Sequence, residues 1–253
     1  MSSGSGVSAD VELKFVRLAK KLIGGHPIIC DIGSRDAQEG IFLMQRLDGK
    51  ALHVFEPNPS AAQICRQNLA KFTSEGGGIA TFNQVAVADR IGELPFYPVN
   101  ASLSENKDGG FSSLFQINPD YTKTRGRIVQ DQVVVNATTL DEYFRDKKQP
   151  DLLWIDVEGA ELQVLRGAAA VLRGVTLLHI EVSFRPMQIG KPLFWEISRH
   201  LSDHGFAFHS FMEISAFRGF LYRHRLLPNL PWRLNAVFYR KEGGLVRAGQ
   251  KAI

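Results

Sequence analysis

The chain has 253 residues, a formal charge of +4, 44% hydrophobic residues and 22% charged residues. This balance is typical of a soluble globular protein, and it excludes a mainly disordered chain, a collagen-like fibre and a coiled coil. The charge is too small to demand a nucleic-acid partner. No apolar run approaches the roughly 18–20 residues that a membrane-spanning helix needs, and the first residues lack the apolar stretch of a secretory signal. The two cysteines, Cys30 and Cys65, are too few for a disulfide framework, so we expect core thiols and a cytoplasmic location.

Apolar spacing predicts helices and strands that alternate along the chain. Val11, Phe15, Leu18 and Leu22 recur at helical spacing, so an amphipathic helix is expected before Gly24. Further helices are expected near residues 38–47, 59–71, 160–174 and 194–204, with a short one capped by Thr138 or Thr139. Strands are expected near residues 26–33, 51–56, 79–88, 93–99, 133–138, 151–156, 175–184, 206–214 and 233–240.

This alternation indicates βαβ units and a mostly parallel sheet. The last two strands lack a helix between them, so one strand near the C-terminus is expected to be antiparallel. We predict one α/β domain over residues 27–241, preceded by an N-terminal extension over 1–26 and followed by a flexible tail over 242–253. Residues 100–128 show no clear period and are predicted to form a mobile lid over the ligand.

Acidic residues end four of the predicted strands. These are Asp31, Glu56, Asp156 and Glu181, with Glu158 two positions beyond the third strand. Ligands of open α/β sheets bind at the carboxyl ends of the strands. We therefore expect these side chains to gather at one ligand-binding edge.

The glycine turn after the first strand indicates the type of ligand. Gly33 begins a turn without the second glycine of a dinucleotide site, and the chain has no phosphate-binding P-loop. Asp31 precedes Gly33, and an anion there suits a cationic ligand such as S-adenosylmethionine. Glu56 lies 23 residues after Gly33, where an acid can bind both ribose hydroxyls. Alternatively, Glu56 stabilises a helix N-terminus.

Several segments resemble the FkbM-type methyltransferase family. They are DIGSRD at 31–36, VFEPNP at 54–59, AVADRIGE at 86–93, TLDEY at 139–143, WIDVEGAELQVLRGA at 154–168 and IEV at 180–182. The resemblance implies a class I (Rossmann-like) three-layer sandwich with a seven-stranded sheet. It also implies S-adenosylmethionine as methyl donor and a hydroxyl of a sugar, polyketide or related product as acceptor. Ser34 and Arg35 depart from the small and amide residues that the family has there.

The resemblance also implies roles for individual residues. Asp31, Gly33 and Ser34 would line the methionine part of the cofactor, and Asp156 would face the methyl-transfer centre. Two further groups complete the expected cofactor site: Glu56, Pro57 and Asn58 at the ribose, and Ala86 and Val87 near the adenine.

An alcohol acceptor is a weak acid, so its proton needs a base or a metal ion. Asp156 or Glu158 is a candidate base. Alternatively, Asp156 and Glu181 hold a hard divalent ion such as Mg²⁺. Glu158 and Glu161 have a simpler interpretation as helix N-terminal charges.

Other features favour less specific roles. His200 and His204 are spaced as a metal pair but lack an evident third ligand, and His179 is expected in the core. Two groups of basic residues remain: Lys123, Arg125 and Arg127 in the long loop, and the basic and aromatic segment 216–233. Either group would bind a phosphate, an acidic glycan or an anionic membrane surface. Alternatively, each forms a solvated face or a subunit contact.

Three alternatives to a small-molecule or glycan O-methyltransferase stay open. A nucleic-acid methyltransferase is disfavoured because IDVEG stands where a base amino-group enzyme would have an Asn/Asp-Pro-Pro-aromatic motif. A nicotinamide-dependent oxidoreductase is opposed by the missing second glycine. A catalytically inactive S-adenosylmethionine-binding module is supported by the altered turn at Ser34 and Arg35.

Overall fold

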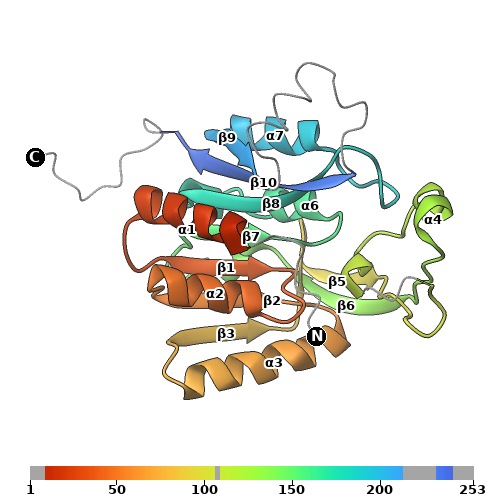
Figure 1. The fold of residues 1–253 in the computed structure, drawn as a ribbon, viewed down its shortest axis with the longest axis horizontal. Coiled ribbons are helices and arrows are strands. Elements are labelled where there is room, and N and C mark those ends of the chain that lie inside the picture. The colour runs from red at the N-terminus through yellow and green to blue at the C-terminus, as the bar shows by residue number, and fades with distance from the viewer. Residues whose placement is uncertain (1–8, 106–108, 213–231, 242–253) are drawn as a thin grey trace, which may run out of the picture.

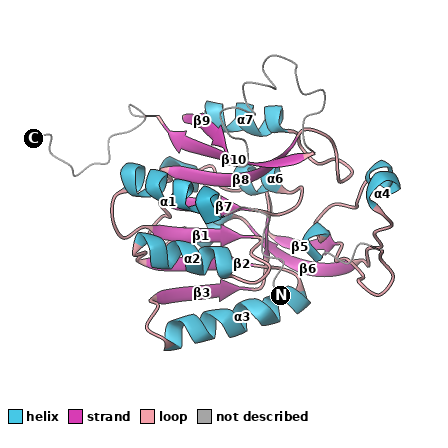
Figure 2. Ribbon diagram, in the orientation of Figure 1, coloured by secondary structure: helices cyan, strands magenta, loops and turns pink. Residues whose placement is uncertain are grey.

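Seven strands form the central sheet in the order β3-β2-β1-β7-β8-β10-β9 (Figures 1 and 2). In this computed structural model, the described residues are 9–105, 109–212 and 232–241. Only β10 runs antiparallel to its neighbours β8 and β9, which confirms the expected α/β class with one antiparallel strand. The strand bounds are β1 Ile28–Ile32, β2 Ala51–Phe55, β3 Ile79–Asn83, β7 Leu152–Ile155, β8 Leu177–Ser183, β9 Phe206–Phe211 and β10 Arg233–Arg240.

Helices cover both faces of this sheet, and each face has its own apolar core. Strands β1 and β8 are buried at every position, which is why they appear in the sequence as continuous apolar runs rather than as alternating ones. One face packs against α1 Ala9–Ile23, α2 Gln38–Leu47 and α3 Pro59–Ser74, and the other against α5 Leu140–Tyr143, α6 Glu161–Arg166 and α7 Phe194–Asp203.

Helix α1 joins the domain through an aromatic contact. The Phe15 ring meets Trp154 edge-on, with centroids 5.4 Å apart, and His179 stacks on Trp154 at 3.4 Å. His179 is buried, so it is the core histidine that the sequence predicts. Burial lowers its pKa to about 3, so the imidazole is neutral at physiological pH. Cys30 and Cys65 are likewise buried free thiols, as expected.

A second, three-stranded sheet was not predicted from the sequence. It has the order β4-β6-β5, with β4 Ala86–Val87 parallel and β5 Gly92–Phe96 antiparallel to β6 Val133–Thr138. The sequence indicates strands at these positions. It does not reveal that these strands form a separate sheet. The alternation of buried and exposed residues shows which face of a strand is buried, but not which strands pair with it.

The described residues of the segment 97–131 (97–105 and 109–131) form a structured excursion rather than an irregular loop. The segment contains a 3₁₀ turn at Gly109–Phe111 and helix α4 Pro119–Arg125. The Asn118 amide donates to Met187 O at 2.8 Å, and the Ile189 amide donates to Gln116 O at 2.8 Å. These contacts tie the excursion to the segment after β8. Its closure as a lid over a ligand stays a prediction.

One helix boundary differs from expectation, and the structure decides between the two expected caps of another helix. The helix expected over 160–174 ends with α6 at Arg166, and a separate 3₁₀ turn follows at Val171–Arg173. Thr139 rather than Thr138 caps α5, since its hydroxyl accepts the Glu142 amide at 3.0 Å. The predicted tail after residue 241 lies outside the described residues, as does most of the basic and aromatic segment.

Candidate active site

The acids at the strand ends gather at one edge of the sheet, because β2, β1, β7 and β8 are consecutive parallel neighbours. Asp31 lies on β1 and Glu181 on β8, while Glu56 and Asp156 directly follow β2 and β7. Apart from Asp156, which is only partly covered, these residues are buried. The edge therefore carries more buried carboxylates than a structural role in a sheet requires.

Neutral donors hold the Asp31 carboxylate. Its Oδ2 accepts hydrogen bonds from the Ser34 hydroxyl and, at 3.2 Å, from the Gly40 amide. Burial, followed by the nearby charge of Glu39, raises the pKa of Asp31 to about 8. Both donors are neutral, and no cationic side chain pairs with this carboxylate among the described residues. A positively charged ligand would stabilise its ionised form.

Gly33 brings the first turn against the end of β7. Its φ of 82° lies in the left-handed region. A Cβ at this position would lie only 1.9 Å from the Asp156 carbonyl oxygen. No residue with a side chain fits there, so Gly33 allows the turn after β1 to lie directly against the backbone of Asp156.

Glu56 joins two loops at the end of β2. Its carboxylate accepts the Arg35 amide at 3.0 Å and the Asn58 amide at 2.7 Å. Burial raises the pKa of Glu56 to about 7, although both amides and the Arg35 charge oppose this shift. Asn58, followed by Pro59, caps helix α3 by accepting the Ser60 amide at 3.2 Å. Glu56 is therefore not that helix's cap, and Pro57 lies in the turn between them.

Ala86 and Val87 form β4 in the second sheet and are each 3% exposed. Val87 packs in the main core together with Phe55, while Ala86 packs within the second sheet. Their contact with an adenine ring stays a prediction.

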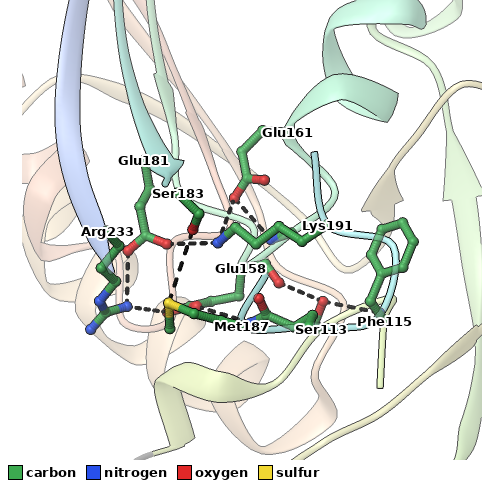
Figure 3. Close-up of polar contacts among 11 residues, drawn as sticks. Ser113, Phe115, Glu158, Glu161, Glu181, Ser183, Met187, Lys191 and Arg233 are labelled. Carbon is green, nitrogen blue, oxygen red and sulfur yellow. Dashed lines mark hydrogen bonds and ion pairs between the residues drawn. The ribbon is translucent and has the colours of Figure 1, made fainter. Parts of the chain in front are cut away.

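Glu158 is held in a strained backbone conformation after β7. Its φ is 52°, a left-handed value that is uncommon for a residue with a side chain. The Ser113 hydroxyl donates to the Glu158 carbonyl at 2.7 Å (Figure 3). Strain of this kind clusters at functional sites, where surrounding contacts maintain it.

Two basic residues that the sequence analysis did not assign to the site neutralise its β8 side (Figure 3). The buried Lys191 ammonium lies 3.0 Å from Glu181 Oε1 and 3.7 Å from Glu161 Oε1. Arg233 Nη1 lies 2.8 Å from Glu181 Oε2 and 2.7 Å from Glu158 Oε1. Although burial raises the pKa of Glu181, the charges of Lys191 and Arg233 outweigh burial and lower it.

Asp156 carries one of two buried carboxylate oxygens of this edge that have no hydrogen-bond partner among the described residues. These oxygens are Asp156 Oδ1 and Glu161 Oε2, and Glu161 differs in that its other oxygen is paired with Lys191. Burial, and then the charges of Glu181 and Glu158, raise the pKa of Asp156 well above the ordinary range. An Asp carboxylate in this environment is a stronger base than one in water, and it has an oxygen available for a ligand proton.

The three carboxylates of Asp156, Glu158 and Glu181 have oxygens within 4.8 Å of one another, a spacing that could hold a metal ion. Arg233, however, already lies between two of them. A divalent ion therefore does not fit this cluster while the guanidinium stays in place.

The other predicted features lie outside this edge or have other partners. His200 and His204 have ring centroids 4.4 Å apart, but no third metal ligand joins them among the described residues. In the excursion, Lys123 pairs with Asp120 at 2.7 Å, and Arg127 donates to Leu103 O at 2.9 Å.

The side chain of Arg125, in the excursion, lies outside the described residues. So do three arginines of the basic and aromatic segment that precede Arg233, namely Arg218, Arg223 and Arg225. No helix within the described ranges is long and apolar enough to span a bilayer.

Comparisons with known proteins identify the family. The "Methyltransferase FkbM domain" profile matches residues 31–208. The chain is 26% identical over 186 residues to the 2-O-methyltransferase NoeI of Sinorhizobium fredii (strain NBRC 101917 / NGR234), covering 73% of each protein. It is 26% identical over 164 residues to the methyltransferase sdnD of Sordaria araneosa, covering 56% of this chain and 60% of that relative.

Among solved structures, the fold resembles the precorrin-6y C5,15-methyltransferase from Geobacter metallireducens GS-15. The TM-score is 0.50 at 11% identity, and the match covers 96% of this chain and 94% of that one. This likeness supports the class I methyltransferase fold expected from the sequence. Because the family profile matches well over half of the residues, the chain belongs to the FkbM family of S-adenosylmethionine-dependent methyltransferases.

Proposed function

We propose that the protein transfers the methyl group of S-adenosylmethionine to a hydroxyl of a small molecule, a sugar or a glycan. The observation that carries this proposal is Asp156, whose unpartnered Oδ1 lies one strand from the cofactor turn at Asp31. The name of a relative, 2-O-methyltransferase, supports oxygen as the methyl acceptor.

The donor binds across the carboxyl ends of β2 and β1 in this proposal, with its sulfur toward β7. Glu56 accepts the ribose hydroxyls, and Asp31, with the turn at Gly33 and Ser34, faces the cationic methionine part. The neutral donors on Asp31 suit this role, because the sulfonium and ammonium of the ligand supply the charge that the protein does not. Pro57, Asn58, Ala86 and Val87 complete the cofactor surface.

Methyl transfer is then an in-line displacement. The acceptor oxygen forms a bond to the methyl carbon while the carbon–sulfur bond breaks, and its electron pair stays on sulfur as S-adenosylhomocysteine forms. The hydroxyl proton passes to Asp156, with Glu158 as the second candidate base. The protein contributes alignment of the two reactants as well as proton removal.

The charge of the edge favours a neutral acceptor over a nucleic acid. Asp156, Glu158, Glu161 and Glu181 outnumber the two cations paired with them, Lys191 and Arg233. A phosphate backbone binds to basic surfaces and would be repelled here. Metal-assisted deprotonation through Asp156 and Glu181 is the alternative mechanism, and Arg233 argues against it.

The test has two stages. Calorimetry with S-adenosylmethionine, S-adenosylhomocysteine and NAD identifies the cofactor, and we expect binding of the first two only. A labelled-methyl assay on glycan, small-molecule and nucleic-acid pools then identifies the acceptor, with mass spectrometry locating the methyl group on oxygen. Binding of NAD alone, or label found only in nucleic acid, would contradict the proposal.

A further inference from the structure

Arg233 connects a carboxylate of strand β8 with one of the turn after β7. It is the first residue of β10, and its Nη1 atom lies within 2.8 Å of both Glu181 Oε2 and Glu158 Oε1 (Figure 3). Its guanidinium also lies over the Phe111 ring of the excursion, at 5.6 Å from the centroid. The side chain therefore contacts the site from the strand that runs antiparallel to the others.

The position of Arg233 is that of a cation shared by acidic ligands. Oxygens of Asp156, Glu158 and Glu181 lie within 4.8 Å of one another. A divalent ion binds carboxylate oxygens at such a spacing, so Arg233 lies where such an ion would bind. A guanidinium offers fixed, always charged donors in place of coordination bonds. The remaining oxygen of Glu181 is taken by Lys191, and that of Glu158 accepts from Gln188 Nε2 at 3.3 Å.

We propose that Arg233 is the resident cation of this cluster, that it replaces a divalent metal ion there, and that it positions Glu158 and Glu181 beside Asp156. Two of the three carboxylates thereby share one guanidinium that holds them in place. Asp156 is left as the carboxylate whose Oδ1 has no partner in the described part of the chain. The contribution of this arrangement to methyl transfer rests on the proposed function, whereas the exclusion of metal does not.

Arg240 provides a matched control, since it lies at the opposite end of the same strand. Its guanidinium donates to the backbone carbonyls of Val175, at 2.9 Å, and of Leu172. Arg240→Gln therefore removes an arginine and its hydrogen bonds from β10 without altering the acidic cluster.

The experiment measures Mn²⁺ binding by electron paramagnetic resonance on chelator-treated protein, so it needs no acceptor. We expect wild type, Arg233→Lys and Arg240→Gln to bind Mn²⁺ no more tightly than about millimolar. Arg233→Gln should bind one ion at least about tenfold more tightly. Adding Glu181→Gln to Arg233→Gln should abolish this gain, and Mn²⁺ should raise the melting temperature of Arg233→Gln alone.

Two results would overturn the proposal. One is a wild-type protein that takes up a single tightly bound Mn²⁺ ion which Glu181→Gln removes. The other is a folded Arg233→Gln variant that binds Mn²⁺ no better than wild type. If Arg233→Gln does not fold, the wild-type and Glu181→Gln titrations decide the question. A protein that lacks methyltransferase activity would leave these metal-binding results unchanged, so the two proposals fail separately.

Discussion

The two halves of the acidic edge hold their carboxylates by different means. At β1 and β2, a hydroxyl and three backbone amides donate to Asp31 and Glu56. At β8 and the turn after β7, Glu181 and Glu158 receive charged side chains, Lys191 and Arg233. We call these the cofactor half and the acceptor half.

This difference shows where each half obtains its positive charge. A buried carboxylate is costly unless a charge or several hydrogen bonds compensate it. In the acceptor half, the protein supplies two cations of its own, Lys191 and Arg233.

In the cofactor half, burial raises the pKa of Asp31 to about 8 and that of Glu56 to about 7. A cationic ligand group would favour the ionised form of Asp31, and hydroxyl donors would favour that of Glu56. The pKa of Glu158 is likewise raised to about 7, so a raised pKa is not confined to the cofactor half. Asp156 lies where the two halves meet.

The largest effect is expected at this junction. Asp156→Asn should lower turnover by roughly 10²–10⁴, because the amide cannot accept the acceptor proton. Its near-identical shape should leave S-adenosylhomocysteine affinity within about twofold of wild type. Steady-state kinetics and calorimetry measure the two quantities. Asp151→Asn, at the start of the same strand, is the control. Full turnover in Asp156→Asn would remove this residue from the chemistry, and Glu158 would be tested next.

The second effect concerns stability in the acceptor half. Lys191→Met should lower the free energy of unfolding by about 3–5 kcal/mol, because it leaves Glu161 and Glu181 buried without this cation. Urea unfolding at neutral pH measures the loss. The exposed Lys71→Met should stay within about 0.5 kcal/mol of wild type. A loss below about 1 kcal/mol in Lys191→Met would mean that the acceptor half does not depend on its internal cations.

The third effect concerns the cofactor half. Glu56→Ala should weaken S-adenosylhomocysteine binding roughly ten- to a hundredfold, because the loss of one charge-assisted hydrogen bond lowers affinity by about this factor. The chain should stay folded. Calorimetry measures the affinity, and Glu75→Ala at the end of α3 is the control. Unchanged affinity in a folded Glu56→Ala variant would remove Glu56 from the cofactor site.

The smallest effect is a pH dependence of cofactor binding. Below pH 7, Asp31 and Glu56 are largely protonated in the ligand-free protein, since burial raises both pKa values. A cationic ligand group favours the ionised form of Asp31 and hydroxyl donors favour that of Glu56, so binding releases protons and affinity rises with pH.

We expect a rise in S-adenosylmethionine affinity of up to about tenfold per pH unit for each proton released, between pH 6 and 7.5. Calorimetry in two buffers of different ionisation enthalpy counts these protons. Asp31→Asn should reduce the slope. A flat profile, or one that falls with pH, would show that the cofactor half does not bind a cation.

The mostly parallel character of the main sheet and the positions of the strand-end acids could be predicted from the sequence, because both follow from local signals. Buried strands such as Ile28–Ile32 appear as apolar runs, and Asp31 and Asp156 end two of them. The carboxyl ends of parallel neighbours then meet by topology alone.

The partners of the acids could not be predicted in this way. Arg233 is 75 residues from Glu158 in sequence and belongs to a segment whose arginines look like a solvated or anion-binding face. Lys191 follows β8 in a region without a recognised motif. One signal was present: several buried carboxylates at one edge demand internal cations, and Lys191 is one of the few basic residues just beyond β8. The second sheet was missed because strand partners are long-range.

The most direct test is a structure determined with S-adenosylhomocysteine bound. We expect the ribose hydroxyls on Glu56, the sulfur between the ends of β1 and β7 on the side of Asp156, and Arg233 still between Glu158 and Glu181. A ligand bound elsewhere, a ribose that does not reach Glu56, or a metal ion in place of the Arg233 guanidinium would contradict it.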